Sequence, residues 1–241
     1  MTTACIIQAR IGSARLPAKV LLPLPTGRTV LEEVIFRCRQ IKGIDVVVAA
    51  IPDTSDNDIL VASAEKAAEP YCNHFAEIAE RVNKSFAPVQ TIRGPEHNVL
   101  ARYALAAHIV DADVIMRVTA DCPMIDPKTC GEVLSLFMDH GHLDYCSNVH
   151  PRTFPQGLDC EVFSRAALLD AARANTTDYQ REHVTPYIAE HPDCRKTGIV
   201  SPVDRSHHRW TLDTIEDYVR IWGLLANRHV QILPLESAGC A

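Results

Sequence analysis

Hydrophobic positions along the chain alternate between short continuous runs and stretches with helical spacing. The runs at residues 4–7, 45–51 and 113–118 are typical of buried strands, which need hydrophobic side chains on both faces of a sheet. Residues 30–41 and 98–110 instead carry hydrophobic side chains on one helical face. This alternation predicts an α/β fold with a mostly parallel sheet and helices on both of its faces.

The same pattern predicts the remaining elements. Further strands are expected at residues 89–93, 145–148, 158–163 and 197–201. Further helices are expected at residues 56–68, 73–86, 164–174, 179–190 and 214–227, and one begins at Pro127. Because no repeat, linker or low-complexity segment interrupts the series, we expect residues 1–241 to form a single domain.

Composition and charge exclude some classes of binding partner. The formal net charge of −6 argues against a nucleic-acid-binding surface, which is normally basic. No apolar run approaches the roughly 20 residues that span a membrane, so no membrane partner is expected. The nine cysteines form no CxxC pair and no signal peptide precedes them, which favours reduced thiols in a cytoplasmic protein.

The loop after the first predicted strand combines basic side chains with a glycine. Arg10, Arg15 and Lys19 flank Gly12 and Ser13, beyond the carboxyl end of a strand, where open α/β sheets bind ligands. Glycine allows a close backbone approach, and three cations can neutralise a triphosphate. The loop is neither a Walker A motif nor GxGxxG. Its residues alone leave two interpretations open, a phosphate-binding loop and a solvated basic loop.

Two aspartates are candidates for a metal site. Asp121 follows a predicted strand, and Asp213 is predicted to end a short one. Mg²⁺ prefers one or two carboxylates together with substrate phosphates, so this pair suits it. For Asp213 an ordinary charge at a helix N-terminus is an equally good interpretation, and Asp126 is interpreted as a helix cap.

Further polar residues point to a second ligand. Asp159 and Glu161 are two residues apart, so on a strand they would share one face. Burying two acids is costly without partners, which suggests a substrate hydroxyl, an amine or an arginine nearby. Tyr179 and His183 are predicted to share a helix face, and His183 is open to a substrate-binding or a structural interpretation. Arg117, at the end of the strand before Asp121, is assigned to substrate binding with these residues.

Six segments taken together resemble a known family. They are QARIGSARLPAKVL, HNVLARY, RVTADCPMIDP, GLDCEVF, REHVTPYI and WTLDTIEDY, and in this order they cover nearly the whole chain. The set resembles the cytidylyltransferase family that includes CMP-Kdo synthetase, acylneuraminate cytidylyltransferase and, in particular, the SpsF-type spore-coat polysaccharide proteins. The resemblance implies a GT-A-like nucleotide-diphospho-sugar transferase fold. It also implies transfer of a nucleotidyl group, usually CMP from CTP, with release of pyrophosphate.

The resemblance assigns roles to these residues. The nucleotide would be held by Gln8, Ala9, Arg10, Gly12, Ser13, Arg15 and Lys19. The residues expected to be catalytic are Arg15, Lys19, Asp121 and Asp213, and the two aspartates would hold Mg²⁺. The acceptor would contact Arg117, Asp159, Glu161 and His183. Asn98 stands where an acidic residue is expected, Ala120 where glycine is common, and the segment near residues 65–89 is longer than usual.

The hypothesis that follows is attack by an acceptor oxygen on the α-phosphorus of CTP, or of another nucleoside triphosphate. The acceptor would be a small anion: a sugar acid, a phosphosugar or a phosphonate. Two alternatives remain, a glycosyltransferase that uses a nucleotide-sugar on the same fold and a nucleotide-binding protein without catalysis. A homodimer is the expected assembly.

Overall fold

The computed structural model describes residues 1–69, 86–174, 176–227 and 239–240. In these residues eight strands form one sheet, in the order β3-β2-β1-β4-β6-β5-β7-β8. The strands are β1 (Thr3–Gln8), β2 (Val46–Pro52), β3 (Val89–Gly94), β4 (Val114–Thr119), β5 (Tyr145–Ser147), β6 (Glu161–Ser164), β7 (Lys196–Val200) and β8 (Gly239–Cys240). The helix expected at residues 73–86 falls on positions outside the described residues, apart from Phe86.

The strand order creates a switch point beside β1. The chain runs from β1 outward through β2 to β3 in parallel pairs, and then returns to place β4 parallel to β1 on its other side. Beyond β4 only β6 and β8 run the opposite way, which confirms the mostly parallel sheet. The winding reverses between β1 and β4, and ligands of open α/β sheets bind in the crevice beyond the carboxyl ends of the strands at such a point.

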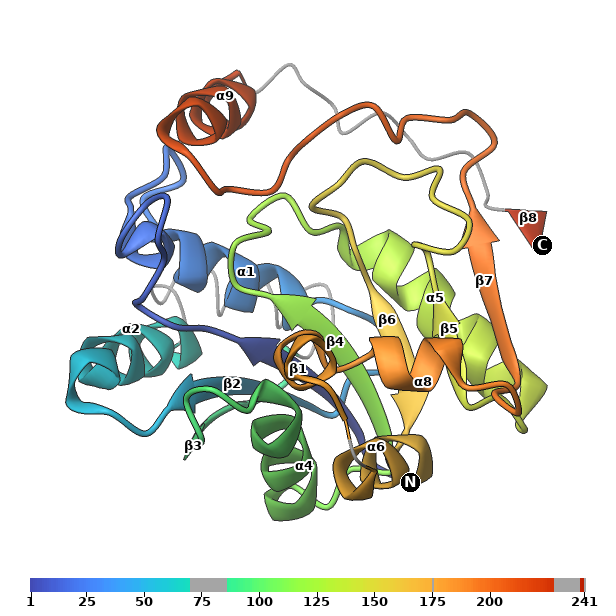
Figure 1. The fold of residues 1–241 in the computed structure, drawn as a ribbon. Helices are drawn as coiled ribbons and strands as arrows, with labels where there is room; N and C mark the ends of the chain where they lie inside the picture. The colour runs from blue at the N-terminus through green and yellow to red at the C-terminus, as the bar shows by residue number, and fades with distance from the viewer. Residues whose placement is uncertain (70–85, 175, 228–238, 241) are drawn as a thin grey trace.

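Helices cover both faces of the sheet because successive strand residues face opposite sides. Cys5 and Ile7 of β1 pack into one core with α1 (Val30–Cys38), α2 (Asp58–Ala68) and α5 (Pro127–His140). Ala4 and Ile6 pack into a second core with α4 (Val99–Ile109), α6 (Arg165–Arg173) and α8 (Pro186–Glu190). Figure 1 shows α4, α6 and α8 in front of the sheet and α1 and α5 behind it.

A third, smaller core attaches the last helix. α9 (Ile215–Ala226) packs through Ile221 onto Leu24, Val30 and Leu212, at the edge of the molecule above the ends of β1 and β4 (Figure 1). The start of this helix is fixed by Thr214, which accepts a hydrogen bond from the Asp217 amide in a capping box. This packing places the segment before α9 over the switch point.

The predicted helix starts are confirmed by their caps. The side chains of Thr29, Asp126 and Ser164 each accept a hydrogen bond from a backbone amide three residues on. Pro127 occupies the first turn of α5, where its missing amide donor is not needed. The Asp126 carboxylate therefore caps a helix, as interpreted from the sequence.

The single helix expected at residues 179–190 is wrong. The structure has α7 (Asp178–His183) and α8, separated by Val184 and Thr185. Pro186 explains the break, because its ring and missing N–H are incompatible with a helix that continues from the preceding turn. Val184 adopts a φ of 69°, a left-handed conformation that strains a β-branched residue.

Two further findings concern the described residues as a whole. Their cysteines are free thiols: Cys194 is half-buried and the others, Cys5, Cys38, Cys122, Cys130, Cys146 and Cys160, are buried. None of the helices in the described ranges combines the length and apolar character that crossing a bilayer requires.

Candidate active site

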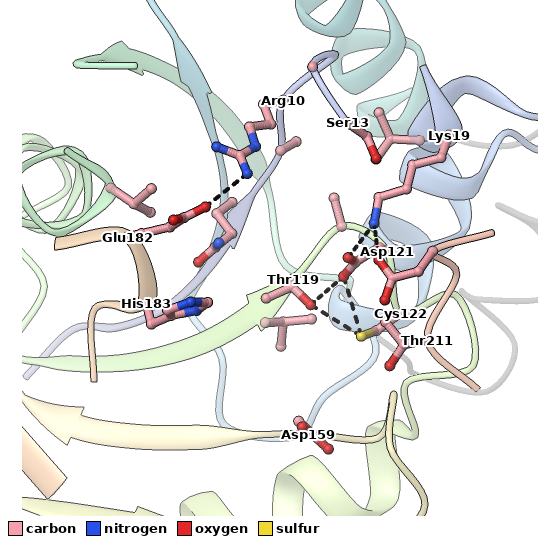
Figure 2. Close-up of a pocket in the computed structure, with 18 of the residues that line it drawn as sticks. Arg10, Ser13, Lys19, Thr119, Asp121, Cys122, Asp159, Glu182, His183 and Thr211 are labelled. Carbon is pink, nitrogen blue, oxygen red and sulfur yellow. Dashed lines mark hydrogen bonds and ion pairs between the residues drawn. The ribbon is translucent and has the colours of Figure 1, made fainter. Parts of the chain in front are cut away.

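The switch point between β1 and β4 opens into a cleft of about 570 Å³. It is lined by the end of β1 and the loop after it, the end of β4, residues of α4 and α7, and the segment before α9. Figure 2 looks into this cleft, with Lys19 and Asp121 on one side and Arg10, Glu182 and His183 on the other. The cleft lies where the strand order predicts a ligand site.

All residues assigned to the site from the sequence line this cleft except Glu161. Those that line it are Gln8, Ala9, Arg10, Gly12, Ser13, Arg15, Lys19, Arg117, Asp121, Asp159, His183 and Asp213. Glu161 lies beneath the cleft surface and is 7% exposed. The structure thus gathers segments that are up to about two hundred residues apart in the sequence, while their individual roles stay predictions.

Lys19 joins the two candidate metal ligands. Its ammonium donates to Asp121 Oδ2 at 2.7 Å and to Asp213 Oδ1 at 2.8 Å. Lys19 begins the short 3-10 helix Lys19–Leu21, directly after Ala18, whose left-handed φ of 56° turns the chain back into the cleft. The side chain of Lys19 is only 12% exposed, so the three charges interact in a partly dehydrated environment.

The electrostatics keep this cluster charged. Burial alone would lower the pKa of Lys19, but Asp121 and Asp213 together raise it above its usual value. Burial alone would raise the pKa of Asp213, but hydrogen bonds and charge from Lys19, with Arg15 and Arg209, lower it. The raised pKa of Lys19 and the lowered pKa of Asp213 therefore keep this ion pair charged at neutral pH.

Asp121 is held in place from two sides. Thr119, the last residue of β4, donates its hydroxyl to Asp121 Oδ1 at 2.6 Å. The amide of Leu212 donates to the backbone oxygen of Asp121 at 2.8 Å, which ties the loop after β4 to the segment that carries Asp213. Burial raises the pKa of the adjacent Cys122 thiol well above its usual value, so this side chain stays protonated and is a poor nucleophile.

Asp213 does not end a strand, contrary to prediction. The segment before it makes one isolated bridge, between Gln156 and Arg209, and no ladder, because its amides bond to loops instead. Arg209 and Arg15 both form ion pairs with the Asp213 carboxylate. The Asp217 side chain of α9 accepts from the Asp213 amide at 3.1 Å. Asp213 is therefore positioned by a helix start rather than by the sheet.

Gly157 allows the segment before Asp213 to lie against a neighbouring loop. Gly157 has a φ of 99°, and a Cβ there would lie 2.5 Å from the carbonyl carbon of Trp210 and 2.6 Å from the Thr211 nitrogen. The amide of Trp210 donates to the Gln156 oxygen at 2.7 Å across the same contact. A glycine is thus required at this position by both conformation and space.

Arg117, which lines the cleft, lies directly opposite the buried Glu161 across β4 and β6. Arg117 Nη1 donates to Glu161 Oε2 at 2.5 Å, and the Tyr145 hydroxyl donates to Glu161 Oε1 at 2.7 Å. Arg117 also donates to the Gln8 side chain at 3.2 Å. Burial raises the pKa of Tyr145 and Glu161 raises it further, so the phenol stays protonated.

Asp159 forms an ion pair with a different arginine, Arg152. Both nitrogens of the Arg152 fork donate to the Asp159 carboxylate at 2.8 Å. Of the partners expected for Asp159 and Glu161, the structure shows the arginine: Arg152 for the first and Arg117 for the second. The expectation that the two acids share a strand face is wrong, because β6 begins only at Glu161 and Asp159 belongs to the preceding loop.

The side of the cleft opposite Lys19 carries α7. Tyr179 and His183 do share a helix face, and their ring centroids are 4.5 Å apart. Burial lowers the pKa of His183, and the positive charges of Arg117 and Arg10 lower it further. The neutral imidazole is therefore favoured at neutral pH.

Several residues of this site were not singled out from the sequence. They are Thr119, Glu182 and Thr211, which line the cleft, and Arg152 and Arg209, which pair with its aspartates. All but Arg152 lie within or next to the segments that carry the family resemblance. Their partners lie far away along the chain, and no spacing rule could have supplied the pairing.

The carboxylates of Asp121 and Asp213 suit a hard divalent cation. In the described ranges no group of three or more His, Cys, Asp or Glu side chains is arranged to hold a metal. The two carboxylates that already share the Lys19 ammonium show that one cation can contact both. Two protein carboxylates, completed by water and substrate phosphate, fit Mg²⁺ rather than a metal that needs an all-protein cage.

Comparison with known proteins identifies the family. The model of the family described as cytidylyltransferase matches residues 4–68 and 74–224. The chain belongs to the cytidylyltransferase family. Over 227 residues it is 34% identical to the spore coat polysaccharide biosynthesis protein SpsF of Bacillus subtilis, an alignment that covers 91% of this chain and 84% of that protein.

Solved structures agree with this assignment. A cytidylyltransferase from Leptospira borgpetersenii is 29% identical, with a TM-score of 0.81 that covers 94% of this chain and 87% of the other. A CMP:2-keto-3-deoxy-manno-octonic acid synthetase complexed with CTP is 17% identical, with a TM-score of 0.61 over 94% of this chain and 99% of the other. These likenesses confirm the nucleotidyltransferase fold that the resemblance implied.

Proposed function

We propose that this chain is a CTP-dependent cytidylyltransferase that activates a sugar acid, a phosphosugar or a phosphonate and releases pyrophosphate. The observation that carries the proposal is the Lys19–Asp121–Asp213 cluster, where the basic loop meets two carboxylates at the switch point of the sheet. Membership in the cytidylyltransferase family supports the reaction type, and the fold shared with a CTP complex supports the choice of nucleotide.

The triphosphate would lie along the basic loop. Arg15 is 62% exposed at the cleft and can turn to a phosphate without breaking the core. Lys19 donates to both aspartates, so its ammonium lies next to the position where the phosphates and the aspartates would meet. Both cations would neutralise the charge that builds on the departing pyrophosphate.

Asp121 and Asp213 would hold Mg²⁺. When bound, the ion would shield the phosphate oxygens and lower the pKa of an acceptor hydroxyl. Thr119 and Leu212 would keep the Asp121 carboxylate oriented, and Arg209 would do the same for Asp213. These supports matter because a metal ligand must be held within a fraction of an ångström.

In the reaction, an acceptor oxygen attacks the α-phosphorus of CTP and forms a new P–O bond. The bond between the α-phosphorus and the bridging oxygen breaks on the opposite side, and pyrophosphate leaves with those electrons. A phosphate or phosphonate acceptor is already ionised and needs no general base. A sugar hydroxyl would pass its proton to solvent water during the attack, and a bound Mg²⁺ would assist this by lowering the pKa of the hydroxyl.

A screen of pyrophosphate release tests the proposal. The four ribonucleoside triphosphates would be paired with nonulosonic acids, phosphosugars and phosphonates, with Mg²⁺ and with EDTA. We expect release with CTP and one acceptor class, and none with EDTA. Binding of a nucleotide-sugar without pyrophosphate release would favour the glycosyltransferase, and nucleotide binding without any turnover would favour a non-catalytic protein.

Two expectations accompany this function. Free thiols and a nucleotide substrate are consistent with a cytoplasmic enzyme. A homodimer is also proposed, and light scattering after size-exclusion chromatography would measure the mass against the 26.7 kDa of one chain.

A further inference from the structure

A buried asparagine outside the cleft contacts the loop that we propose binds the triphosphate. Asn57 is 1% exposed and ends the short 3-10 helix Ser55–Asn57, which connects β2 to α2. Its side-chain oxygen accepts a hydrogen bond from the Ile11 amide at 2.8 Å, although the two residues are 46 positions apart in the chain. Asn57 does not line the cleft, so any effect that it has on a ligand must pass through the loop.

The Asn57 side chain does not cap the helix that follows it. Asn57 is the residue before α2, a position where asparagine side chains commonly accept from an amide of the helix, yet it makes no such bond. The Thr54 side chain does not cap the 3-10 helix either, and its hydroxyl oxygen accepts instead from Asn57 Nδ2 at 2.8 Å. Both side chains therefore serve the contact with the loop rather than their own helices.

These hydrogen bonds fix the orientation of the Asn57 amide. A backbone N–H can only donate, so the side-chain oxygen must face Ile11 and the NH₂ group must face Thr54. The Thr54 backbone is held in turn by Arg93 of β3, which donates to its carbonyl oxygen at 2.7 Å. A buried polar network whose members are satisfied is rigid, so Asn57 is a firm support for the Ile11 amide.

Ile11 lies at the base of the loop. Its carbonyl oxygen accepts from the Ala18 amide at 3.0 Å, which closes the chain between the two residues. Gly12 and Arg15 lie within the closed segment, exposed and lining the cleft. The Ile11 side chain packs against the hydrophobic core, and the bond to Asn57 fixes its backbone. Asn57 therefore holds the residue at which the loop leaves and rejoins the protein.

We propose that Asn57 is a positioning residue for triphosphate binding, because it holds the Ile11 amide and with it the closed loop at residues 11–18. The inference rests on the proposed function, in which this loop binds the phosphates. A loop that is already ordered loses less conformational entropy when a ligand binds, so its support contributes to affinity. Asn57 acts on nucleotide binding without contacting the nucleotide.

Isothermal titration calorimetry with CTP and with inorganic tripolyphosphate tests this role. Asn57→Leu keeps the approximate size of the side chain but leaves the Ile11 N–H without its acceptor. The Kd of both ligands should rise about tenfold and by the same factor, because the loop would contact the phosphates that they share. Hydrogen–deuterium exchange without ligand should become faster at residues 11–18.

Thr54 provides a milder pair of variants in case Asn57→Leu does not fold. Thr54→Val removes the hydroxyl that accepts from Asn57 Nδ2 and should raise both Kd values about threefold. Thr54→Ser keeps the hydroxyl and should bind both ligands as the wild type does. If Thr54→Ser weakens binding as much as Thr54→Val, the hydrogen bond is not the cause and the positioning role is wrong.

Ser164→Ala is the matched control for lost stability. The Ser164 hydroxyl oxygen accepts from the Ala167 amide at 3.1 Å, outside the cleft, so this variant also deprives one backbone N–H of a side-chain acceptor. Its Tm should fall by roughly 2–4 °C with no change in either Kd. An equal loss of affinity in Ser164→Ala and Asn57→Leu would show a general effect of lower stability and contradict the positioning role.

Wild-type binding separates this inference from the proposed function. If the wild type binds both ligands and Asn57→Leu leaves both Kd values unchanged, or weakens CTP alone, only the positioning role is overturned. Wild-type binding of tripolyphosphate but not CTP would overturn the choice of nucleotide, and tripolyphosphate would still decide the role of Asn57. Failure of the wild type to bind either ligand would overturn both proposals.

Discussion

The Lys19–Asp121–Asp213 cluster and the Arg117–Glu161–Tyr145 cluster both place partly buried charges near the end of β4, but different parts of the fold hold them. The first is assembled by loops beyond the strand ends, and all three of its residues line the cleft. The second is built across neighbouring strands, where Arg117 lies opposite Glu161 in the ladder. Charges held by loops can be re-paired with a ligand, whereas charges held between strands need each other for the fold to be stable.

The largest effect is expected for Asp121→Asn, which separates catalysis from folding in the first cluster. The amide keeps the shape of the side chain but cannot serve as an anionic metal ligand, so turnover should fall by at least about 1,000-fold. The Tm should stay close to that of the wild type, because Lys19 keeps Asp213 as its partner. The pyrophosphate-release assay and a thermal melt measure the two quantities.

A matched control for this variant is Asp139→Asn, the same chemical change on an exposed residue of α5 outside the cleft. It should leave turnover and Tm unchanged. Near-normal activity of Asp121→Asn would remove Asp121 from the metal site.

Glu161→Gln should give the opposite result in the second cluster. It leaves the Arg117 charge buried without its carboxylate, which costs about 3 kcal/mol. In a chain of this size the Tm should fall by roughly 6–12 °C. The expected loss is one of stability, because Glu161 itself does not line the cleft. If Glu161→Gln is as stable as the wild type, the fold does not depend on the Arg117–Glu161 ion pair, and the contrast with the Lys19–Asp121–Asp213 cluster is wrong.

A smaller loss is expected for Tyr145→Phe, which removes only the hydroxyl that donates to Glu161. A buried hydrogen bond to a charged group contributes about 1.5–3 kcal/mol, and urea unfolding would measure the loss. Tyr179→Phe on α7 is the control, since that side chain is 61% exposed. If both variants unfold at the same urea concentration, Tyr145 does not support the second cluster.

The smallest effect should be a change with pH. The pKa of Asp213 is lowered in the folded protein despite burial, because Lys19, Arg15 and Arg209 stabilise its charged form. The unfolded pKa is about 3.9, so the stability from ionised Asp213 is complete above roughly that pH and lost as pH falls through the folded pKa. The stability gap between wild type and Asp213→Asn should therefore be constant from about pH 5 to 7 and shrink on acidification. A gap that widens below about pH 4 would contradict the assigned direction.

The sequence predicted what depends on local pattern. Hydrophobic runs located the strands, and the caps at Thr29, Asp126 and Ser164 located three helix starts, because a cap is made by residues three apart. It missed the break before α8, where Pro186 overrides an otherwise continuous helical pattern. Local signals succeed when the residues that interact are neighbours in the chain.

The residues of the candidate site could not be predicted from local pattern alone. Family resemblance selected Lys19, Asp121 and Asp213, but their contact depends on strand order, and the pairs are 102 and 194 residues apart. The sequence indicated arginine as one type of partner for Asp159 and Glu161, but it did not indicate which arginines. Which arginine serves which acid follows from where β6 begins and how it pairs with β4, and hydrophobic spacing does not encode that register.

The contact at Gly157 makes the position of Asp213 depend on a residue without a side chain. A single methyl group at this position would push on the backbone at Trp210 and Thr211, two to three residues before Asp213. The displaced carboxylate would no longer meet Asp121 across Lys19, although every charged residue would still be present. A sequence that keeps every charged residue of the site but carries a side chain at position 157 would therefore encode an inactive enzyme, so position 157 is as diagnostic as the aspartates themselves.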